Sequence, residues 1–323
     1  MHKGVRAVKT RKLGKSGLET GLLCLGGNVF GWTLKEPLAS KLLDAFVESG
    51  LNMIDTADVY SKWIPGNKGG DSEEVIGGWI KSSGKRDKVL IATKCGIEMA
   101  PGEEGLSRAY IMRAVERSLK RLNTDYIDLY QAHRDDEKTP LEETLGAYAD
   151  LIKQGKVRAI GASNYSAERL AQALKVSKDN GLPRYDTLQP WYNLYDRKDF
   201  EGPLQDLCVK EDIGVIPYFS LASGFLTGKY RKLEDAEGKP RGYRVKDMLN
   251  ERGMKILGAL DAVAAETKSN QAQVALAWLM AQPSIAAPIA SATSLEQLKD
   301  LVAATTLELS PAQVQALNDA SAY

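Results

Sequence analysis

Hydrophobic residues fall along the chain in two alternating patterns. Short runs rich in Leu, Ile and Val predict buried β-strands, and longer runs with a period near that of a helix predict amphipathic helices. One such pair recurs about every 30 to 40 residues, with turn residues between its members. The strands are expected at 22–25, 51–54, 89–93, 126–131, 157–161, 187–189, 214–218 and 285–289.

The amphipathic runs between these strands predict helices, which makes the fold α/β. Eight strands, each followed by a helix, indicate a closed (β/α)8 barrel, the TIM barrel, because right-handed crossovers place every helix outside a parallel sheet. A single domain over residues 1–323 is therefore expected, with Ser107 and Ser166 as helix caps. The helices are expected at 37–49, 72–81, 108–122, 141–154, 167–179, 202–211, 250–280 and 295–304.

Two segments depart from the repeat of one strand and one helix. Within 11–27, the turn residues Lys15, Ser16 and Gly17 separate two short apolar stretches, which predicts an N-terminal β-hairpin at the barrel floor. After the seventh strand, 229–247 form a long polar loop. Loops of this length inside a compact domain are typical of lids or of disordered segments.

Composition and charge narrow the class of protein. Hydrophobic residues make up 43% and charged residues 26%, which excludes disordered and fibrous classes. Lys and Arg number 43 against 42 Asp and Glu, so neither a nucleic-acid nor a membrane partner is expected. Three widely spaced cysteines favour a reducing compartment. The basic N-terminus continues into polar residues and no long apolar run occurs, so a cytoplasmic location without a secretory signal or membrane span is expected.

The segment after the first predicted strand does not favour a dinucleotide-binding domain of the Rossmann type. That domain requires G-x-G-x-x-G at this place, whereas the chain reads LGGNVFGW over 25–32. In a closed barrel, functional side chains instead project from the carboxyl ends of the strands. The residues that end each strand are therefore the candidates for chemistry.

Ionisable side chains gather at those ends. Asp55 and Tyr60 follow the second strand, Lys94 follows the third and His133 follows the fourth, while the only other histidine is His2. Taken singly, an Asp after a strand can be a helix cap, and a Tyr or His can have a structural role. Packing does not predict all four at one end of three consecutive strands, so a catalytic cluster is expected there.

The chemistry that needs this set is carbonyl reduction. Hydride delivery to a carbonyl carbon leaves negative charge on the oxygen, which requires a proton donor and oriented hydrogen bonds. Tyr60 is expected to donate the proton, with its pKa lowered from about 10 by the Lys94 ammonium. Asp55 is expected to hold Lys94, and a neutral His133 to orient the carbonyl.

Several stretches of the chain resemble the aldo-keto reductase superfamily over nearly its whole length. They are NMIDTADVY, ATKCG, YIDLYQAHR, TPLEETLGAYADLIKQGKVRAIGASNYS, LQPWYNLYDR and GFLTGKY. The resemblance implies a catalytic tetrad of Asp55, Tyr60, Lys94 and His133, in agreement with the residue-based interpretation. It also implies metal-free reduction by a nicotinamide cofactor, with NADPH as the usual donor.

The resemblance further implies which residues bind the cofactor. Ser163, Asn164 and Gln189 would hold the nicotinamide carboxamide, and Tyr218 would cover one face of the ring. Gly26, Gly27 and Asn28 would line the same end, Leu221, Gly224, Leu226, Thr227, Gly228 and Lys229 would cover the pyrophosphate, and Arg244 would be a further charge partner.

The segment that binds the adenosine end departs from the family pattern. Relatives often carry Arg there and end the segment with Glu-Asn, whereas this chain has Ser291, Thr293, Gln297 and Asp300. The 2′-phosphate of NADPH is best bound by Arg or Lys, and Lys299 is the only cation nearby. NADH is therefore kept as an alternative cofactor to NADPH.

Aromatic residues in the loops after the strands are the candidates for a substrate pocket. Phe30, Trp32, Trp63 and Trp191 are expected to form apolar walls around a small-molecule carbonyl held by Tyr60 and His133. No oligomeric state is predicted, because helix faces that pack on a barrel and those that pack on a partner chain have the same periodicity.

Two other functions use the same residues. A Schiff-base lyase or aldolase would use Lys94 as its amine nucleophile, but such a lysine needs a lowered pKa and Asp55 would raise it. A cofactor-binding regulatory subunit with little turnover is the other alternative, because the TGKY region resembles the channel β-subunit branch of the superfamily. Retention of all four tetrad residues favours turnover.

Overall fold

The computed structural model describes residues 9–239 and 241–323, so His2 and Pro240 lie outside the described part. Eight parallel strands form one sheet in the order β10, β3, β4, β5, β6, β7, β8, β9. Val215 closes the ring, since its N–H donates to Ser284 O at 2.8 Å and its carbonyl accepts from Ala286 N at 2.8 Å. The strands are β3 (Cys24–Gly26), β4 (Met53–Asp55), β5 (Leu90–Cys95), β6 (Ile127–Ala132), β7 (Val157–Ser163), β8 (Thr187–Gln189), β9 (Gly214–Val215) and β10 (Ile289–Ala290). The predicted (β/α)8 barrel is confirmed.

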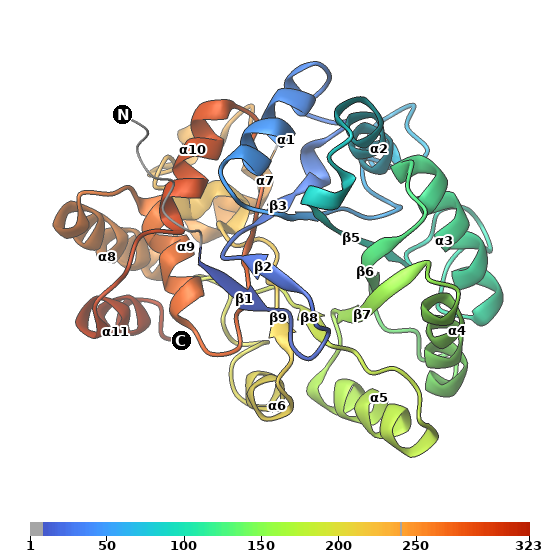
Figure 1. Cartoon of the computed structure of the whole chain (residues 1–323). Helices are drawn as coiled ribbons and strands as arrows, with labels where there is room; N and C mark the ends of the chain where they lie inside the picture. Colours follow the sequence, from blue (N-terminus) through green and yellow to red (C-terminus); the bar gives the residue numbers. More distant parts are fainter. Residues whose placement is uncertain (1–8, 240) are drawn as a thin grey trace, which may run out of the picture.

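The helices surround the sheet on its outside (Figure 1). Their apolar stripes pack onto the outward-facing strand residues in one extended core. Ser107 and Ser166 cap two of them as predicted, accepting from the N–H groups of Tyr110 and Arg169. The helices are α1 (Leu38–Glu48), α2 (Asp71–Ser83), α3 (Arg108–Leu122), α4 (Leu141–Lys153), α5 (Ala167–Asn180), α6 (Pro203–Glu211), α7 (Gly242–Val245), α8 (Glu251–Thr267), α9 (Gln271–Ala281), α10 (Leu295–Ala304) and α11 (Pro311–Ala320).

The predicted hairpin lies across one end of the barrel (Figure 1). Strands β1 (Thr10–Lys12) and β2 (Glu19–Gly21) pair antiparallel. Leu13 and Leu18 in the turn between them are buried in the same small core as Met53 and Leu129, which point into the barrel. The hairpin therefore seals the barrel floor, and the site must open at the opposite end.

The structure differs from the predicted elements mainly near the C-terminal end of the chain. The single helix expected over 250–280 is two helices, because Lys268 takes a left-handed φ of 54° and Asn270 begins α9 with a capping box. Helix α11 was not predicted, although Ser310 and Pro311 mark its start. The seventh and eighth strands are shorter than predicted, and Tyr218 lies beyond β9 in an isolated bridge to Trp191.

The long polar loop predicted over 229–247 is mostly structured. It contains the short 3-10 helices η4 (Leu233–Ala236) and η5 (Lys246–Met248) on either side of α7. Gly242 is required here, because a Cβ at this position would lie 1.8 Å from the carbonyl oxygen of Ala236. Ala236 and Val245 are buried, so this segment packs onto the barrel as a cap.

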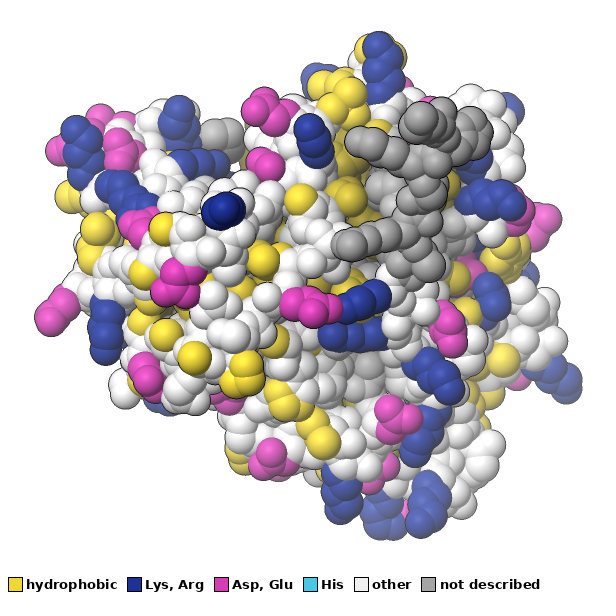
Figure 2. Space-filling model, turned by 60° about the vertical axis from the view of Figure 1, so that its left-hand side comes forward, with side chains coloured by type: hydrophobic (Ala, Val, Ile, Leu, Met, Phe, Trp, Pro, Cys, Tyr) yellow, Lys and Arg dark blue, Asp and Glu magenta, His cyan; other side chains and the backbone are white. Residues whose placement is uncertain are grey.

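On the face shown in Figure 2, basic and acidic side chains are interspersed, and small apolar areas lie between them. Neither sign of charge dominates this face, which agrees with the formal net charge of +1. Among the helices in the described part of the chain, none has the length and apolar character needed to span a bilayer.

Candidate active site

The strand alternation places polar side chains in the top layer of the barrel interior. Met53, Ala92 and Leu129 point inward from three adjacent strands and pack in the barrel core. The residue two positions further along each strand points the same way. Asp55, Lys94 and Gln131 therefore point into the barrel above the apolar layer. In the strand register, Asp55 pairs with Ala92 and Lys94 pairs with Gln131.

Lys94 is the centre of this layer. Its ammonium donates to Asp55 Oδ2 at 2.8 Å, to the carbonyl of Thr56 at 2.7 Å and to the Tyr60 hydroxyl at 3.0 Å. The side chain is fully buried. An ammonium has three N–H donors, and all three are used, so Lys94 is held as a cation aimed at the Tyr60 oxygen.

Tyr60 contacts both members of this ion pair. Its hydroxyl lies 3.3 Å from Asp55 Oδ2 as a donor while it accepts from Lys94. Burial and the nearby Asp55 carboxylate raise the pKa of Tyr60 well above its usual value. The expectation that Lys94 lowers this pKa is therefore wrong for the protein alone, because the loss of hydration and the carboxylate outweigh the ammonium. The phenol stays protonated at neutral pH.

His133 directly follows β6 and faces Tyr60, with 6.0 Å between the ring centroids. Its backbone N–H donates to the carbonyl of Cys95 at 2.9 Å, which fixes its position beside β5. Burial and the Lys94 charge lower the pKa of His133 well below 6.5, so the ring is neutral. Nδ1 is buried with no hydrogen-bond partner among the described residues. The neutral state assumed from the sequence is supported.

The four residues expected to bind a nicotinamide lie together beside this cluster. The Asn164 side-chain oxygen accepts from the Tyr218 hydroxyl at 2.7 Å, and its amide nitrogen donates to Ser163 Oγ at 3.1 Å. The Gln189 amide donates to Asp55 Oδ1 at 2.9 Å, which joins this group to the tetrad. Asn164 has a φ of 58° and an exposed side chain. Hydroxyl and amide side chains can both donate and accept hydrogen bonds, as binding of a carboxamide requires.

The ends of β3 and β10 meet at one corner of the same face. Ser291 Oγ donates to Asn28 Oδ1 at 2.7 Å, although these residues are 263 positions apart. A Cβ on Gly26 would lie 2.5 Å from Ser291 Oγ, and a Cβ on Gly27 would lie 2.8 Å from the carbonyl of Asp55. Glycine is needed at both positions for this close approach.

The segment expected to cover a pyrophosphate forms the tight turn η3 (Ala222–Thr227), whose Thr227 hydroxyl donates to the Gly224 carbonyl at 2.7 Å. Gly224 and Gly228 have φ angles of 93° and 74°, which favour glycine. Lys229 is exposed and folds back over Gly224. Leu226 is buried and Leu221 is half-buried, so these two side chains anchor the turn rather than offer polar contacts.

The segment 291–300, which is expected to bind the adenosine end of the cofactor, makes hydrogen bonds within itself and to α9. Gln297 Oε1 accepts from the N–H of Thr293 at 2.8 Å at the start of α10. Asp300 accepts from the Gln273 amide at 3.4 Å, so it is directed toward α9. Lys299 is the one cation of 291–300, and its side chain is exposed.

The aromatic residues divide into two groups. Trp63 and Trp191 are exposed and Trp32 is half-buried. Trp63 links Trp32 to Tyr60, with ring centroids 5.8 Å and 6.1 Å apart, so these three rings form a wall beside the tetrad. Phe30 is fully buried in the main core. The expectation that Phe30 faces a substrate is wrong, because its ring is packed in the main core and no part of it reaches the surface.

The sequence analysis missed two residues of this face. Gln131 accepts from the Gln189 amide at 3.4 Å, and its own buried amide nitrogen has no hydrogen-bond partner in the part of the chain that the structure describes. A polar residue at the end of a predicted strand was the available signal. Arg241 lies 5.3 Å from the Trp32 ring, and its spacing of three from Arg244 in a polar loop was the only indication of a role.

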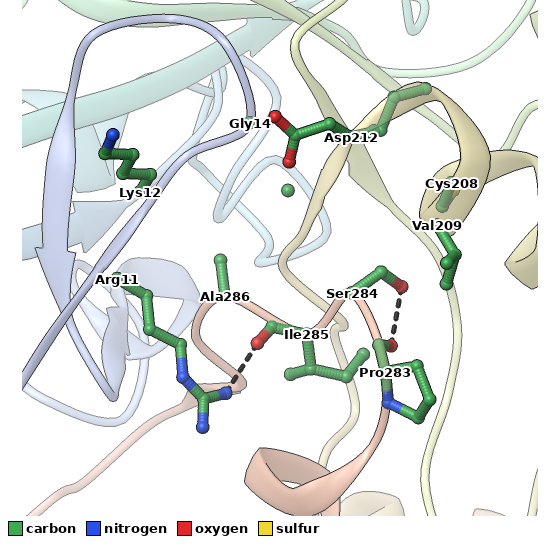
Figure 3. Close-up of a pocket in the computed structure, with 12 residues that line it drawn as sticks. Arg11, Lys12, Gly14, Cys208, Val209, Asp212, Pro283, Ser284, Ile285 and Ala286 are labelled. Carbon is green, nitrogen blue, oxygen red and sulfur yellow. Dashed lines mark hydrogen bonds between the residues drawn. The ribbon is translucent and has the colours of Figure 1, made fainter.

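A separate hollow of about 300 Å³ lies at the opposite end, between the hairpin and α6 (Figure 3). Arg11 spans it and donates to the carbonyl of Ile285 at 2.6 Å. Its wall also contains Asp212, Cys208 and Ser284, but no group of the tetrad. The four expected catalytic residues therefore do not face this hollow.

Comparison with known proteins gives a consistent picture. Residues 22–322 match the family model described as "Aldo/keto reductase family". The chain is 33% identical to "Uncharacterized oxidoreductase YrpG" of Bacillus subtilis, covering 95% of this chain and 94% of that protein. It is also 33% identical to "L-glyceraldehyde 3-phosphate reductase" of Escherichia coli, over 91% and 86%. "Probable voltage-gated potassium channel subunit beta" of Oryza sativa is similar too, at 33% identity over 89% and 88%.

Proposed function

Because this chain belongs to the aldo/keto reductase family and is an oxidoreductase, we propose that it reduces aldehydes or ketones to alcohols with a reduced nicotinamide cofactor. The observation that carries the proposal is the Lys94 ammonium, which donates to both Asp55 and the Tyr60 hydroxyl inside the barrel mouth. No structural need of the barrel requires a buried cation aimed at a phenol. Burying the ammonium and the phenol costs free energy, and a catalytic role would explain why the protein buries them together.

The roles of the four residues follow from their contacts. A carbonyl oxygen placed between Tyr60 and His133 would receive a hydrogen bond from each, which orients its carbon. Tyr60 gives its proton to that oxygen as negative charge develops. Lys94, 3.0 Å from the Tyr60 oxygen, stabilises the phenolate left behind, and Asp55 keeps Lys94 charged and fixed. The bound cofactor supplies the hydride to the carbonyl carbon.

The cofactor fits the residues present. Ser163, Asn164 and Gln189 would hold the carboxamide, and Tyr218 would lie against the ring. The turn that contains Gly224 and the exposed Lys229 would cover the pyrophosphate. We propose NADPH as the donor, as is usual in the family, with NADH as the competitor because residues 291–297 include no Arg or Lys for a 2′-phosphate.

The first experiment is titration of the protein with NADPH and with NADH, followed by tryptophan fluorescence, and then turnover with a panel of aldehydes and ketones. Micromolar binding of either cofactor and its carbonyl-dependent oxidation support the proposal. The Tyr60→Phe variant should bind cofactor as the wild type does while losing a factor of about 10² to 10⁴ in kcat, because general acid catalysis is worth that much. If neither cofactor binds, the proposal is wrong.

The alternatives make different predictions. A regulatory subunit would bind the cofactor tightly and turn over none of the carbonyls. The similarity to the probable potassium channel subunit beta of Oryza sativa is the observation that favours testing this alternative. A Schiff-base enzyme would be trapped on Lys94 by borohydride in the presence of a carbonyl. The Lys94 nitrogen already lies within 3.0 Å of Asp55 Oδ2, the Thr56 carbonyl and the Tyr60 hydroxyl, which leaves little room for attack on a carbonyl carbon and opposes this alternative.

A further inference from the structure

Gln131 is a buried polar residue of the barrel interior, outside the four residues proposed for catalysis. It lies on β6, two positions after the inward-facing Leu129, and its side chain is fully buried. Its amide nitrogen has no hydrogen-bond partner among the described residues. A buried amide without a partner costs free energy, whereas an apolar side chain of similar volume avoids this cost. Packing of the barrel therefore gives no reason for a glutamine at this position.

Gly161 allows Gln131 to reach across the sheet. The strand order is β6, β7, β8, so β7 separates Gln131 from Gln189 on β8. The β7 residue that pairs with Gln131 is Gly161, which pairs in turn with Thr187 of β8. A Cβ on Gly161 would lie 2.1 Å from Thr187 Oγ1 and 3.2 Å from Gln131 Cγ. Because Gly161 has no side chain, its neighbours occupy this space, and Gln131 contacts Gln189 across β7.

This contact helps to fix the orientation of the Gln189 amide. Its nitrogen donates to Asp55 Oδ1 at 2.9 Å and to Gln131 Oε1 at 3.4 Å. An amide nitrogen has two N–H groups, which match these two acceptors. A rotated amide would instead place its oxygen against both of them. Gln189 Oε1 accepts from none of the described residues, so the amide is held with an acceptor left for a ligand.

A nicotinamide carboxamide has the complementary polarity, because its NH2 group donates hydrogen bonds. The other candidate acceptors beside Gln189 are already engaged. Asn164 Oδ1 accepts from the Tyr218 hydroxyl at 2.7 Å, and Ser163 Oγ accepts from the Asn164 amide at 3.1 Å. Gln189 Oε1 is therefore the acceptor of this group that is available to the NH2 of a carboxamide.

We propose that Gln131 is a positioning residue, which holds the Gln189 amide with its oxygen toward the nicotinamide and so makes the protein select a cofactor with an N–H donor there. The inference rests on the proposed function, because it requires a nicotinamide beside Gln189. Gln131 acts through Gln189 and not by contact with the reacting atoms. Its unpartnered nitrogen is the cost of placing an acceptor at this point of the barrel.

The test compares the binding of NADP+ with that of its 3-acetylpyridine analogue, in which a methyl group replaces the NH2 of the carboxamide. Both ligands keep the exocyclic carbonyl, the ring charge and the phosphates, so the ratio of their Kd values reports on the N–H donor. Each Kd is measured by quenching of tryptophan fluorescence, and NAD+ with its own analogue is used if NAD+ binds more tightly. The wild type should bind NADP+ about 5- to 100-fold more tightly, because the analogue leaves an acceptor unpaired.

The variants ask whether Gln131 sets this preference. Gln131→Met should reduce the ratio by about 3- to 10-fold, the net worth of one neutral hydrogen bond, because Gln189 loses one of the two acceptors that orient it. Gln131→Glu keeps an acceptor oxygen and should restore most of the ratio. Thr187→Val is the matched control, since this buried hydroxyl lies beside the same glycine, has no partner among the described residues, and is not bound to Gln189. Its ratio should equal that of the wild type.

Two outcomes overturn the inference and leave the proposed function intact: a wild type that binds the two ligands equally, or a Q131M protein that keeps the wild-type ratio. A merely structural role of Gln131 would give the second result, because both ligands would be weakened alike. Gln131→Leu is measured beside Q131M, so that the loss of the acceptor is tested in whichever apolar variant folds. If the wild type binds neither NADP+ nor NAD+, the proposed function fails, and the inference fails with it.

Discussion

Asp58 gives the sharpest test of the electrostatics beneath the site. It lies between Asp55 and Tyr60 in sequence, its side chain is buried, and neither carboxyl oxygen has a hydrogen-bond partner among the described residues. Arg121, the nearby cation, is bound to Glu73 at 2.6 Å. Burial, and secondly the Glu73 charge, raise the pKa of Asp58 well above 3.8.

The size of the effect follows from proton linkage. A raised pKa in the folded state favours the folded protein at low pH, and this advantage is lost as the pH rises above the unfolded pKa. Each pH unit between about 3.9 and the folded pKa costs about 1.4 kcal/mol, which sets a ceiling of about 4 kcal/mol at pH 7. Asp58→Asn removes the titration and keeps the shape. The buried amide lacks partners as the neutral carboxyl did, so we expect a net gain of about 1–3 kcal/mol in the free energy of unfolding at pH 7.

The assay is urea unfolding followed by circular dichroism at pH 7 and at pH 4. The gain of D58N should be present at pH 7 and nearly absent at pH 4, where the wild-type carboxyl is protonated in both states. Asp87→Asn is the control, because this exposed aspartate pairs with Lys88 and should give no such gain. A D58N protein less stable than the wild type at pH 7 would mean that the ionised carboxylate is stabilised in the fold, which contradicts the argument.

Two further predictions concern a helix contact and a second buried group. Gly77→Ala should cost about 2–4 kcal/mol of stability by overpacking, because its Cβ would lie 2.0 Å from the carbonyl oxygen of Arg121 in α3. Gly78→Ala, on the exposed side of the same helix with open space around it, should instead stabilise by about 0.5–1 kcal/mol, and equal thermal shifts for the pair would refute the packing argument. The lowered pKa of His133 means that the unfolded chain binds its proton first, so stability should fall below about pH 6.5 by up to about 1.4 kcal/mol per pH unit. His133→Gln should flatten that slope in thermal unfolding measured from pH 7 to pH 5, and an unchanged slope would show that other groups cause it.

The sequence alone was sufficient to determine the barrel and the core of the candidate site. A strand in a closed barrel must alternate apolar residues between two buried faces, so its run of Leu, Ile and Val is visible without tertiary information. The same alternation with a period of two places Asp55 above Met53 and Lys94 above Ala92. Residues that follow neighbouring parallel strands meet at one end of the sheet whatever their separation in sequence.

Tertiary contacts decided what depends on groups distant in sequence. The break between α8 and α9 requires the left-handed Lys268, a conformation that no apolar period encodes. Phe30 is buried because its ring packs in the main core. The pKa of Tyr60 is raised by its burial and by the Asp55 carboxylate. The placement of Arg241 over Trp32 joins segments more than 200 residues apart. Local periodicity fixes which face of a strand or helix is buried, whereas the position of a loop side chain and the charge it carries depend on neighbours that only the folded chain brings together.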